Sequence, residues 1–290
     1  MKICPKCSYS FNSTDWLCDQ CGYIPTILDG KYAFCPKLAN SSEGFESHFF
    51  DDLAVLESNN FWFRVRNKII IWAIHKYFFD KQSLLEIGCG TGFVLTALER
   101  AFPDLEISGS EIFTNGLNFA EQRFSRGSLF QMDARAIPFV EEFDVIGAFD
   151  VLEHIQEDTK VLAEMYRATK QGIILTVPQH PWLWSQADEY AHHVQRYTAK
   201  ELKSKVESAG FKVVKMTSFV SLLLPLMMIS RLKPKNSQVK YDPLAELKIG
   251  NFINKTLEYI LNLELILIKI GISLPLGGSL LLIAKKINIE

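Results

Sequence analysis

The stretch that decides the fold is Leu84-Leu85-Glu86-Ile87-Gly88-Cys89-Gly90-Thr91-Gly92. A short apolar run leads into glycines at alternate positions, and the helical pattern of residues 93–100 follows. This order predicts a buried strand, a tight turn and the start of a helix. Glycine tolerates a positive φ angle and a close ligand, and a helix N-terminus exposes free N–H groups. The turn is therefore predicted to bind a ligand.

The glycine spacing narrows the choice of ligand. The spacing here is G-x-G-x-G. In the dinucleotide-binding fingerprint, G-x-G-x-x-G, the third glycine comes one residue later and allows the helix to pack closely on the strand. With Glu86 two residues before it, the segment resembles the first motif of class I S-adenosylmethionine (SAM)-dependent methyltransferases. The resemblance implies that Glu86, Gly88, Gly90 and Gly92 help to bind SAM. An ordinary strand-to-helix turn is the alternative.

Three acidic residues follow at the ends of predicted strands or in the turns after them. Residues 105–111 form a predicted strand that ends in Glu111, whose carboxylate can accept hydrogen bonds from both ribose hydroxyls. NAD enzymes share that feature. The methyltransferase resemblance places Asp133 at the adenine amino group. It places Asp150, which follows the apolar strand 143–149, at the methionine end of SAM.

The remaining pattern predicts an α/β fold. Strands at 172–178, 211–216 and 279–285 alternate with helical segments, which is typical of a doubly wound parallel sheet. The resemblance implies a seven-stranded Rossmann-like methyltransferase sheet whose last strand is antiparallel between the fifth and sixth. Residues 219–275 form a helical insertion before that strand. The insertion is expected to pack on the sheet or against a second copy, with a membrane-surface helix as the alternative.

Two C-x-x-C pairs near the N-terminus predict a metal site. Four thiolates complete the tetrahedral shell of a structural zinc ion and leave no open position for catalysis. The segment resembles a zinc ribbon, and the predicted ligands are Cys4, Cys7, Cys18 and Cys21. Disulfide bonds are the alternative. The ribbon is expected to serve as a protein-docking surface or a lid.

Composition sets the domain boundaries. The ribbon occupies residues 1–25, and residues 26–45 mix Pro, Gly, Ser and Asn without periodicity, which predicts a linker. The methyltransferase domain occupies residues 46–290. Cys35 and Cys89 are expected to be unpaired.

A helix is predicted before the first strand of the sheet, and it carries Arg64 and Arg66. Arginine suits bidentate pairing, so either residue is a candidate for binding a carboxylate of SAM or of the substrate. Solvated arginines beside an aromatic core are the alternative.

A polar and aromatic loop after the fifth strand is the predicted acceptor site, because ligands bind beyond the carboxyl ends of parallel strands. The run 178–202 resembles methyltransferases encoded with bacterial polysaccharide and lipid-modification genes, although Gln195 replaces the first residue of their basic pair. The resemblance implies a small-molecule, glycan or lipid-linked acceptor. His193 is the first candidate base for O-methylation and His154 the second; a buried structural histidine is the alternative.

The segment Asp150-Val151-Leu152-Glu153-His154 suggests a second metal site. Its spacing resembles the metal site of some SAM-dependent O-methyltransferases acting on quinone rings or RNA ends, with Asp150 in place of a glutamate. His193, in the predicted acceptor loop, is the candidate to complete such a set of ligands. A divalent ion there would lower the pKa of the acceptor hydroxyl.

Composition limits the other functions. The net charge of −2 and the pI near 6.3 make nucleic acid an unlikely partner. No signal peptide is apparent, and the apolar run 219–229 is shorter than the ~18 residues of a bilayer span. A cytoplasmic protein with optional peripheral membrane contact is expected. The remaining alternatives are a zinc-ribbon rRNA or tRNA methyltransferase and a non-catalytic SAM-fold interaction module; the glycine spacing disfavours an NAD-dependent oxidoreductase.

Overall fold

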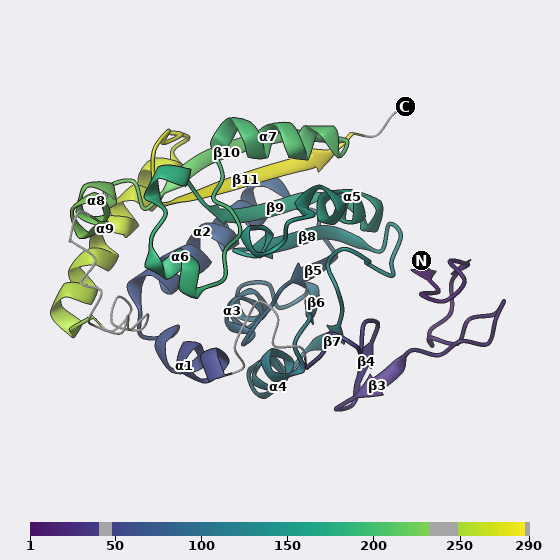
Figure 1. The fold of residues 1–290 in the computed structure, drawn as a ribbon. Coiled ribbons are helices and arrows are strands. Elements are labelled where there is room, and N and C mark those ends of the chain that lie inside the picture. The colour runs from purple at the N-terminus through teal and green to yellow at the C-terminus, as the bar shows by residue number, and fades with distance from the viewer. Residues whose placement is uncertain (41–47, 232–248, 288–290) are drawn as a thin grey trace.

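A mostly parallel sheet forms the centre of the molecule (Figure 1). The computed structural model describes residues 1–40, 48–231 and 249–287. The strands of the sheet within these ranges are β3 (Thr26–Leu28), β4 (Lys31–Ala33), β5 (Ser83–Ile87), β6 (Glu106–Glu111), β7 (Gly127–Gln131), β8 (Phe143–Phe149), β9 (Thr169–Pro178), β10 (Phe211–Phe219) and β11 (Ser279–Lys286). Their order is β10-β11-β9-β8-β5-β6-β7-β4-β3.

The order confirms the doubly wound topology. Strand β5 pairs in parallel with β6 and β8, so that the strand order reverses at the glycine turn. The last strand, β11, is antiparallel to both β9 and β10 and lies between them, as predicted. This arrangement brings the carboxyl ends of β5, β6, β8 and β9 to one edge, where such sheets bind their ligands.

The N-terminal part of the chain adds an edge that the sequence did not predict. Strands β3 and β4 form an antiparallel hairpin, and Ala33 of β4 pairs in parallel with Gln131 of β7. The Gln131 side chain strengthens this join by accepting from the Cys35 N–H and donating to the Cys35 carbonyl. This hairpin corrects the expectation of an irregular linker at residues 26–45, since part of that segment extends the sheet.

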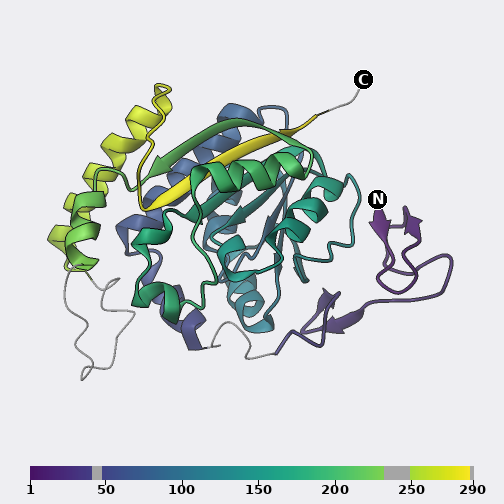
Figure 2. The same cartoon turned by 45° about the horizontal axis from the view of Figure 1, so that its top comes forward.

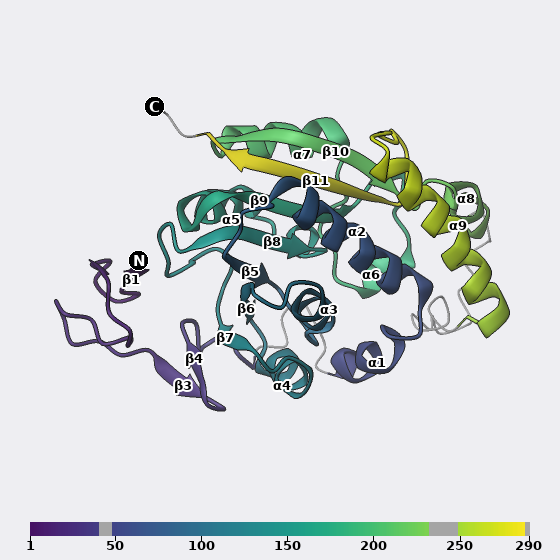
Figure 3. The same ribbon diagram turned by 180° about the vertical axis from the view of Figure 1, so that it is seen from behind.

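Helices cover both faces of the sheet (Figures 1 and 3). The helices in the described ranges are α1 (His48–Leu56), α2 (Phe61–Tyr77), α3 (Phe93–Ala101), α4 (Thr114–Arg123), α5 (Asp158–Ala168), α6 (Gln186–Tyr190), α7 (Ala199–Ser208), α8 (Leu224–Arg231) and α9 (Asn251–Lys269), with short 3₁₀ helices η1 (Leu152–His154) and η2 (Pro181–Leu183). Helices α5 and α7 pack on one face, and α2, α3, α4 and α9 pack on the other. Leu84 and Leu85 are adjacent in β5, yet they pack into these two different clusters because side chains alternate across a strand.

The helical insertion is anchored to helix α2. Arg64 of α2 donates to Glu258 of α9 at 2.6 Å, and the Asn254 side chain accepts from the Phe61 N–H at 2.8 Å. Arg64 therefore joins helices α2 and α9 in this structure, a role that neither the ligand-binding prediction nor the solvated alternative described. Residues 232–248 of the predicted insertion lie outside the described residues. Among the described helices, none has the length and apolar character needed to cross a bilayer.

The cysteine-rich segment packs beside the amino end of β8. Its strands β1 (Lys2–Ile3) and β2 (Ser10–Phe11) form a small hairpin, and the Ile3 N–H donates to the Pro138 carbonyl at 3.0 Å. The Trp16 ring contacts Phe34 and Phe139, with centroid distances of 4.4 and 5.4 Å. The segment lies far from α6 (Figure 2), which argues against a lid over the predicted acceptor loop.

Close packing explains why two positions of the turn after β5 are glycine. Gly88 has a φ of +66°, and a Cβ there would lie 2.5 Å from Val151 Cγ2. Gly92 has a φ of +76°, and its Cβ would lie 2.8 Å from the Ala120 Cα of helix α4. Both the backbone conformation and the neighbouring atoms therefore require glycine at these positions.

We expect Gly92→Ala to destabilise the protein more than Gly30→Ala. Both glycines have a φ of +76°, but a Cβ at Gly30 would meet nothing within 4 Å. The left-handed backbone costs roughly 1–2 kcal/mol in either variant, and overpacking against Ala120 adds about 1–3 kcal/mol in Gly92→Ala. Denaturant unfolding of both variants measures the difference; equal losses would show that helix α4 does not restrict Gly92.

Candidate functional site

The carboxylate of Glu111 joins the end of β6 to the glycine turn. Its Oε2 accepts from the Gly90 N–H at 3.0 Å, and its Oε1 accepts from the N–H groups of Ile112 and Phe113 at 2.7 and 3.3 Å. Burial raises the pKa of Glu111, while these backbone hydrogen bonds oppose the rise. The predicted ribose-binding residue and the glycine turn that is predicted to bind a ligand thus form one unit.

The end of helix α1 closes over this unit. Glu57 accepts from the Thr91 hydroxyl at 2.5 Å and from Arg123 Nη1 at 2.8 Å. A Cβ on Gly90 would have Phe50 Cε1 as its nearest neighbour, at 3.8 Å, so space remains in front of the turn. Sequence reasoning missed Glu57, because a single glutamate after a helix gives no signal of burial.

Glu86 lies beneath the turn in strand β5. Its side chain is 2% exposed, and among the described residues its Oε2 has no hydrogen-bond partner. Burial raises the pKa of Glu86 well above its usual range, with the charge of Arg66 opposing the rise. A buried acceptor without a donor is costly, so this oxygen suits a ligand that donates hydrogen bonds.

Asp133 lies in the turn after β7, on the same edge as Glu111. The N–H of Met132 donates to the Glu111 carbonyl at 3.1 Å, which fixes this turn beside β6. Asp133 accepts from Nε and Nη2 of Arg135, at 3.0 and 2.8 Å. Burial acts to raise the pKa of Asp133, but the Arg135 hydrogen bonds and charge lower it overall. Asp133 therefore remains ionised and able to accept further hydrogen bonds.

Asp150 and Arg66, which were predicted separately as ligand-binding residues, form a partly buried ion pair. Arg66 Nη1 lies 2.5 Å from Asp150 Oδ2, and the Thr176 hydroxyl donates to the same oxygen at 3.0 Å. The Arg66 guanidinium lies over the Trp62 ring, 4.7 Å from its centroid. Asp150 has a φ of +59°, a strained conformation that often occurs at functional sites. Asp150 is not part of the cluster of potential metal ligands that the described residues form there, which consists of Glu153, His154 and His193.

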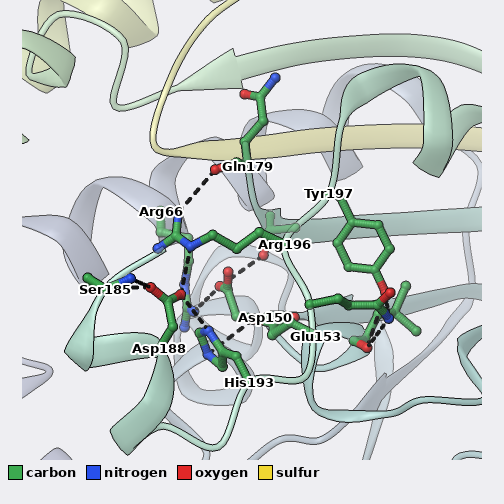
Figure 4. Close-up of polar contacts among 12 residues, drawn as sticks. Arg66, Asp150, Glu153, Gln179, Ser185, Asp188, His193, Arg196 and Tyr197 are labelled. Carbon is green, nitrogen blue, oxygen red and sulfur yellow. Dashed lines mark hydrogen bonds and ion pairs between the residues drawn. The ribbon is translucent and has the colours of Figure 1, made fainter. Parts of the chain in front are cut away.

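Asp188 is the central acceptor of the loop after β9 (Figure 4). Its Oδ1 lies 2.9 Å from His193 Nδ1 and 2.6 Å from Arg196 Nε, and its Oδ2 accepts from the Ser185 N–H at 2.8 Å. Burial favours a higher pKa for Asp188, but the bonds to His193 and Arg196 hold it well below its ordinary value. The carboxylate therefore fixes the His193 ring. Sequence reasoning missed Asp188, although the Ser185-x-x-Asp188 capping box was a readable signal.

Both candidate bases lie beside Glu153. The His154 and His193 rings meet edge to face with centroids 4.8 Å apart, and His193 Nε2 lies 4.0 Å from Glu153 Oε1. Burial, followed by the charges of His193 and His192, lowers the pKa of His154 to about 3. His154 is therefore neutral near pH 7 and a weaker base than an ordinary histidine.

The end of the loop after β9 is anchored on the first residue of helix α5, Asp158. This contact explains why a neutral glutamine is tolerated at position 195. The Tyr197 hydroxyl donates to Asp158 Oδ2 at 2.7 Å, and Gln195 Nε2 donates to the same oxygen at 3.0 Å. Lys205 of helix α7 supplies the positive charge there, with its Nζ 2.7 Å from Asp158 Oδ2. A neutral Gln195 therefore satisfies this site where the resembling methyltransferases have a basic residue.

The N-terminal cysteines fit a tetrahedral ion. The four Sγ atoms lie within 4.8 Å of one another, and the cluster consists of Cys4, Cys7, Cys18 and Cys21. The Cys4–Cys21 Sγ distance is 3.7 Å. The Cys7–Cys18 Sγ distance is 3.6 Å. Four thiolates about 2.3 Å from a central zinc ion lie roughly 3.8 Å apart. The donors and their spacing thus suit zinc, which would supply folding free energy to this small segment. Cys35 and Cys89 are free thiols, as predicted.

Comparison with known proteins gives a family. The family model described as a methyltransferase domain matches residues 60–216. The chain is 27% identical to a demethylmenaquinone methyltransferase from Thermotoga maritima over 188 residues, which is 60% of this chain and 78% of that one. It is 28% identical over 162 residues to a bifunctional biotin-biosynthesis protein from Teredinibacter turnerae, covering 49% of this chain. The match spans only 28% of that larger relative.

Solved structures share the fold. A phosphoethanolamine N-methyltransferase from Haemonchus contortus in complex with SAM has a TM-score of 0.55 and 18% identity, covering 84% of this chain and 58% of that one. A chain from the complex of the Haloferax volcanii Trm112 methyltransferase activator with a methyltransferase has a TM-score of 0.55 and 13% identity, covering 84% of this chain and 95% of that one. These likenesses show a common architecture.

We expect the double substitution Cys4→Ser, Cys7→Ser to abolish zinc binding by the ribbon. Two thiolate ligands are lost, and the remaining pair cannot complete a tetrahedral site. Cys35→Ser is the control, since Cys35 lies outside the four-cysteine cluster. Elemental analysis should give about one zinc per chain for the native protein and the control. Full zinc content in the double variant would contradict the assignment.

We expect Asp188→Asn to destabilise the protein by about 3–5 kcal/mol at neutral pH, because it leaves the buried Arg196 without its charge partner. The exposed Asp104→Asn is the matched control. The lowered pKa of Asp188 gives stability that is fully present above the unfolded value near ~3.9. The difference between native protein and variant should therefore shrink as the pH falls below about 4. Urea unfolding at several pH values measures it, and a constant difference would contradict the ion pair.

Proposed function

Because the chain belongs to the methyltransferase domain family, and so to the class I SAM-dependent methyltransferases, we propose that it methylates an oxygen atom of a small-molecule, glycan or lipid-linked acceptor. The observation that carries this proposal is that the glycine turn after β5 and the loop of residues 179–198 after β9 lie at the same edge of the sheet, on either side of the end of β8. A methyl donor held in the turn would face an acceptor held by the loop.

Residues of the described site fit SAM. SAM supplies a methyl group activated by a positively charged sulfur. Glu111 has roughly four acceptor positions, of which three are occupied by backbone N–H groups. Binding of both ribose hydroxyls therefore requires Glu111 to release one of these N–H groups, and the Gly90 N–H is our candidate because it comes from the glycine turn, whereas the other two directly follow Glu111 in the chain. Asp133 would accept from the adenine amino group.

The Arg66–Asp150 pair suits the zwitterionic methionine end of SAM. A guanidinium pairs with a carboxylate, and an aspartate pairs with an ammonium group. The pair is already aligned at 2.5 Å, and among the described residues Arg66 Nε has no hydrogen-bond partner. On binding, Arg66 would pair with the carboxylate of the ligand and Asp150 with its ammonium group, in place of their contact with each other. Neither side-chain charge would then be buried without a partner.

The acceptor loop combines polar and aromatic groups. Trp182 and Trp184 are 55% and 38% exposed, and the His180 ring stacks on Trp182 with centroids 5.1 Å apart. Exposed indole rings provide apolar contact area near the polar Asp188 cluster. This mixture favours an acceptor that has a hydroxyl group and an apolar portion, such as a glycan or a lipid-linked compound.

His193 is the residue we assign to proton removal. Asp188 engages its Nδ1, which leaves Nε2 as the nitrogen that can accept the acceptor's proton. His154, whose pKa is lowered to about 3, is the less effective choice. A base at this position suits a hydroxyl acceptor, because the hydroxyl oxygen loses its proton when it is methylated.

We expect Glu111→Ala to weaken SAM binding by about 10- to 150-fold, which corresponds to a loss of about 1.5–3 kcal/mol for charge-assisted hydrogen bonds. Glu106→Ala is the control, because Glu106 is exposed at the opposite end of the same strand. Calorimetry with SAM and with NAD measures both affinities. Binding of NAD without binding of SAM would refute the proposal.

We expect His193→Gln to lower kcat by about 10²–10⁴-fold while SAM affinity remains, since a general base contributes on that scale. The acceptor is first identified by incorporation of labelled methyl from SAM into a fractionated metabolite and lipid extract. His192→Asn is the control, because His192 is exposed and its φ of +55° suits asparagine. An unchanged kcat in His193→Gln would exclude His193 as the base.

A further inference from the structure

We propose that an apolar surface on and beside helices α8 and α9 binds the face of an anionic lipid bilayer. Binding to a bilayer does not depend on the proposed function, whereas the delivery of a lipid-linked acceptor from that bilayer rests on it. The residues that define this α8–α9 surface are large, apolar and between 46% and 84% exposed. They are Leu222, Leu226, Ile229, Phe252, Tyr259, Leu263, Ile266 and Ile270.

Helix α9 has apolar side chains on two opposite faces. One face packs into the core, where Leu261 and Ile268 are buried. On the other side, the exposed residues from Tyr259 to Ile270 recur at alternating intervals of four and three residues, and Phe252 lies seven residues before Tyr259. This spacing places them in one stripe along the helix. Surface helices are usually polar on the side away from the core, so the stripe indicates an interaction site.

Helix α8 has a second exposed stripe and is held against α9. Leu222, Leu226 and Ile229 follow one another at helical spacing and are exposed, while the other side of α8 packs into the core. The buried carboxylate of Glu264 in α9 accepts from the N–H groups of Ser221 and Leu222, at 2.7 and 2.8 Å. The two helices therefore bring their apolar stripes to one end of the molecule (Figure 1).

The charges beside the stripes favour an anionic partner. The acidic residues of α8 and α9 are Glu258, which is paired with basic residues of α2, and Glu264, which is buried. Lys255 and Lys269 of α9, in contrast, are exposed. Lysines beside exposed aliphatic and aromatic side chains are typical of helices that lie in a membrane surface, where the cations attract anionic headgroups.

The same charges argue against a second copy of the chain as the occupant. An antiparallel pair of α9 helices that covers the stripe from Phe252 to Ile270 would bring Lys255 of one copy beside Lys269 of the other. Like charges placed together disfavour association. A parallel pair would offer these lysines no acidic partner either, because neither acidic residue of α9 is exposed.

The α8–α9 surface adjoins the edge of the sheet where the predicted acceptor loop begins. Strand β11 is antiparallel to both β9 and β10, so β9 and β10 end at the same edge, and α8 follows β10 as the loop follows β9. The Gln179 N–H donates to the Gly278 carbonyl at 3.0 Å, which joins the loop to the segment after α9. The cysteine-rich segment lies at the other end of the molecule (Figure 2). A lipid-linked acceptor could therefore reach the loop from a bilayer bound at this surface.

Vesicle flotation of the full chain tests the proposal, with vesicles of phosphatidylcholine alone or mixed equally with phosphatidylglycerol. We expect binding to the mixed vesicles and about tenfold or more weaker binding to phosphatidylcholine alone, because the lysines attract anionic headgroups. Raising the salt concentration should weaken binding to the mixed vesicles, since salt screens exposed charges.

The double substitution Leu263→Gln, Ile266→Gln should weaken binding to the mixed vesicles by about tenfold or more, because apolar area no longer enters the bilayer. The matched control is Ile24→Gln, Ile27→Gln, at the end of the molecule away from α9 (Figure 1). Its two side chains are 56% and 60% exposed, against 60% and 54% for Leu263 and Ile266. Urea unfolding verifies that each variant is folded, since exposed substitutions change stability little.

The double substitution Lys255→Gln, Lys269→Gln should reduce the preference for the mixed vesicles. Its control is Lys6→Gln, Lys37→Gln, which removes two exposed lysines from the N-terminal part of the chain. The control should retain the preference of the native protein, because its lysines lie outside the α8–α9 surface.

Absence of binding to the mixed vesicles would overturn the proposal, as would equal binding to both kinds of vesicle or unchanged binding by Leu263→Gln, Ile266→Gln. A dimer that this variant disrupts in light scattering, without vesicle binding by the native protein, would assign the surface to a second copy and so overturn it too. Calorimetry with SAM separates the two proposals. Vesicle binding without SAM binding would refute the proposed function alone, and SAM binding without vesicle binding would overturn the membrane surface alone.

Discussion

The rest of the structure depends on the backbone of the turn at residues 88–92. The turn takes positive φ angles at three glycines, two of which have no room for a side chain because Val151 and Ala120 lie against them. This close contact sets the distance between β5 and the helices beside it, and it also directs the N–H of Gly90 toward Glu111. These contacts of one turn therefore place the start of α3, the end of β6 and the segment after β8 around one space.

Buried and partly buried ion pairs hold the surroundings of that space in fixed positions. Arg66 with Asp150 joins helix α2 to the end of β8, Arg196 with Asp188 closes the loop after β9, and Lys205 with Asp158 ties that loop to helix α5. Such pairs add little net stability, but removing one partner is strongly destabilising, so they specify one arrangement of the loops. Charges fixed in this way favour the alignment on which methyl transfer depends, because the donor and acceptor need not be ordered during the reaction.

The sequence allowed the doubly wound sheet and the antiparallel last strand to be predicted, because each core strand carries its own apolar pattern beside a turn signal. It did not reveal the β3–β4 hairpin, whose strands are three residues each and gain their place only by pairing with β7. The same limit applies to the site. Glu111 ends a readable strand, whereas the partners of Glu57 and Asp150 come from distant segments and exist only in the folded chain. The roles of the nominated residues in binding and catalysis stay predictions.

The most direct test of the central claim, that the glycine turn and the acceptor loop form one active site, is a crystal structure with S-adenosylhomocysteine. The account predicts the ribose on Glu111, with the bond from Gly90 released. It also predicts the amino-acid end of the ligand between Arg66 and Asp150, and the sulfur directed toward His193. A nucleoside bound away from Glu111, or a sulfur directed away from the loop of residues 179–198, would contradict the account.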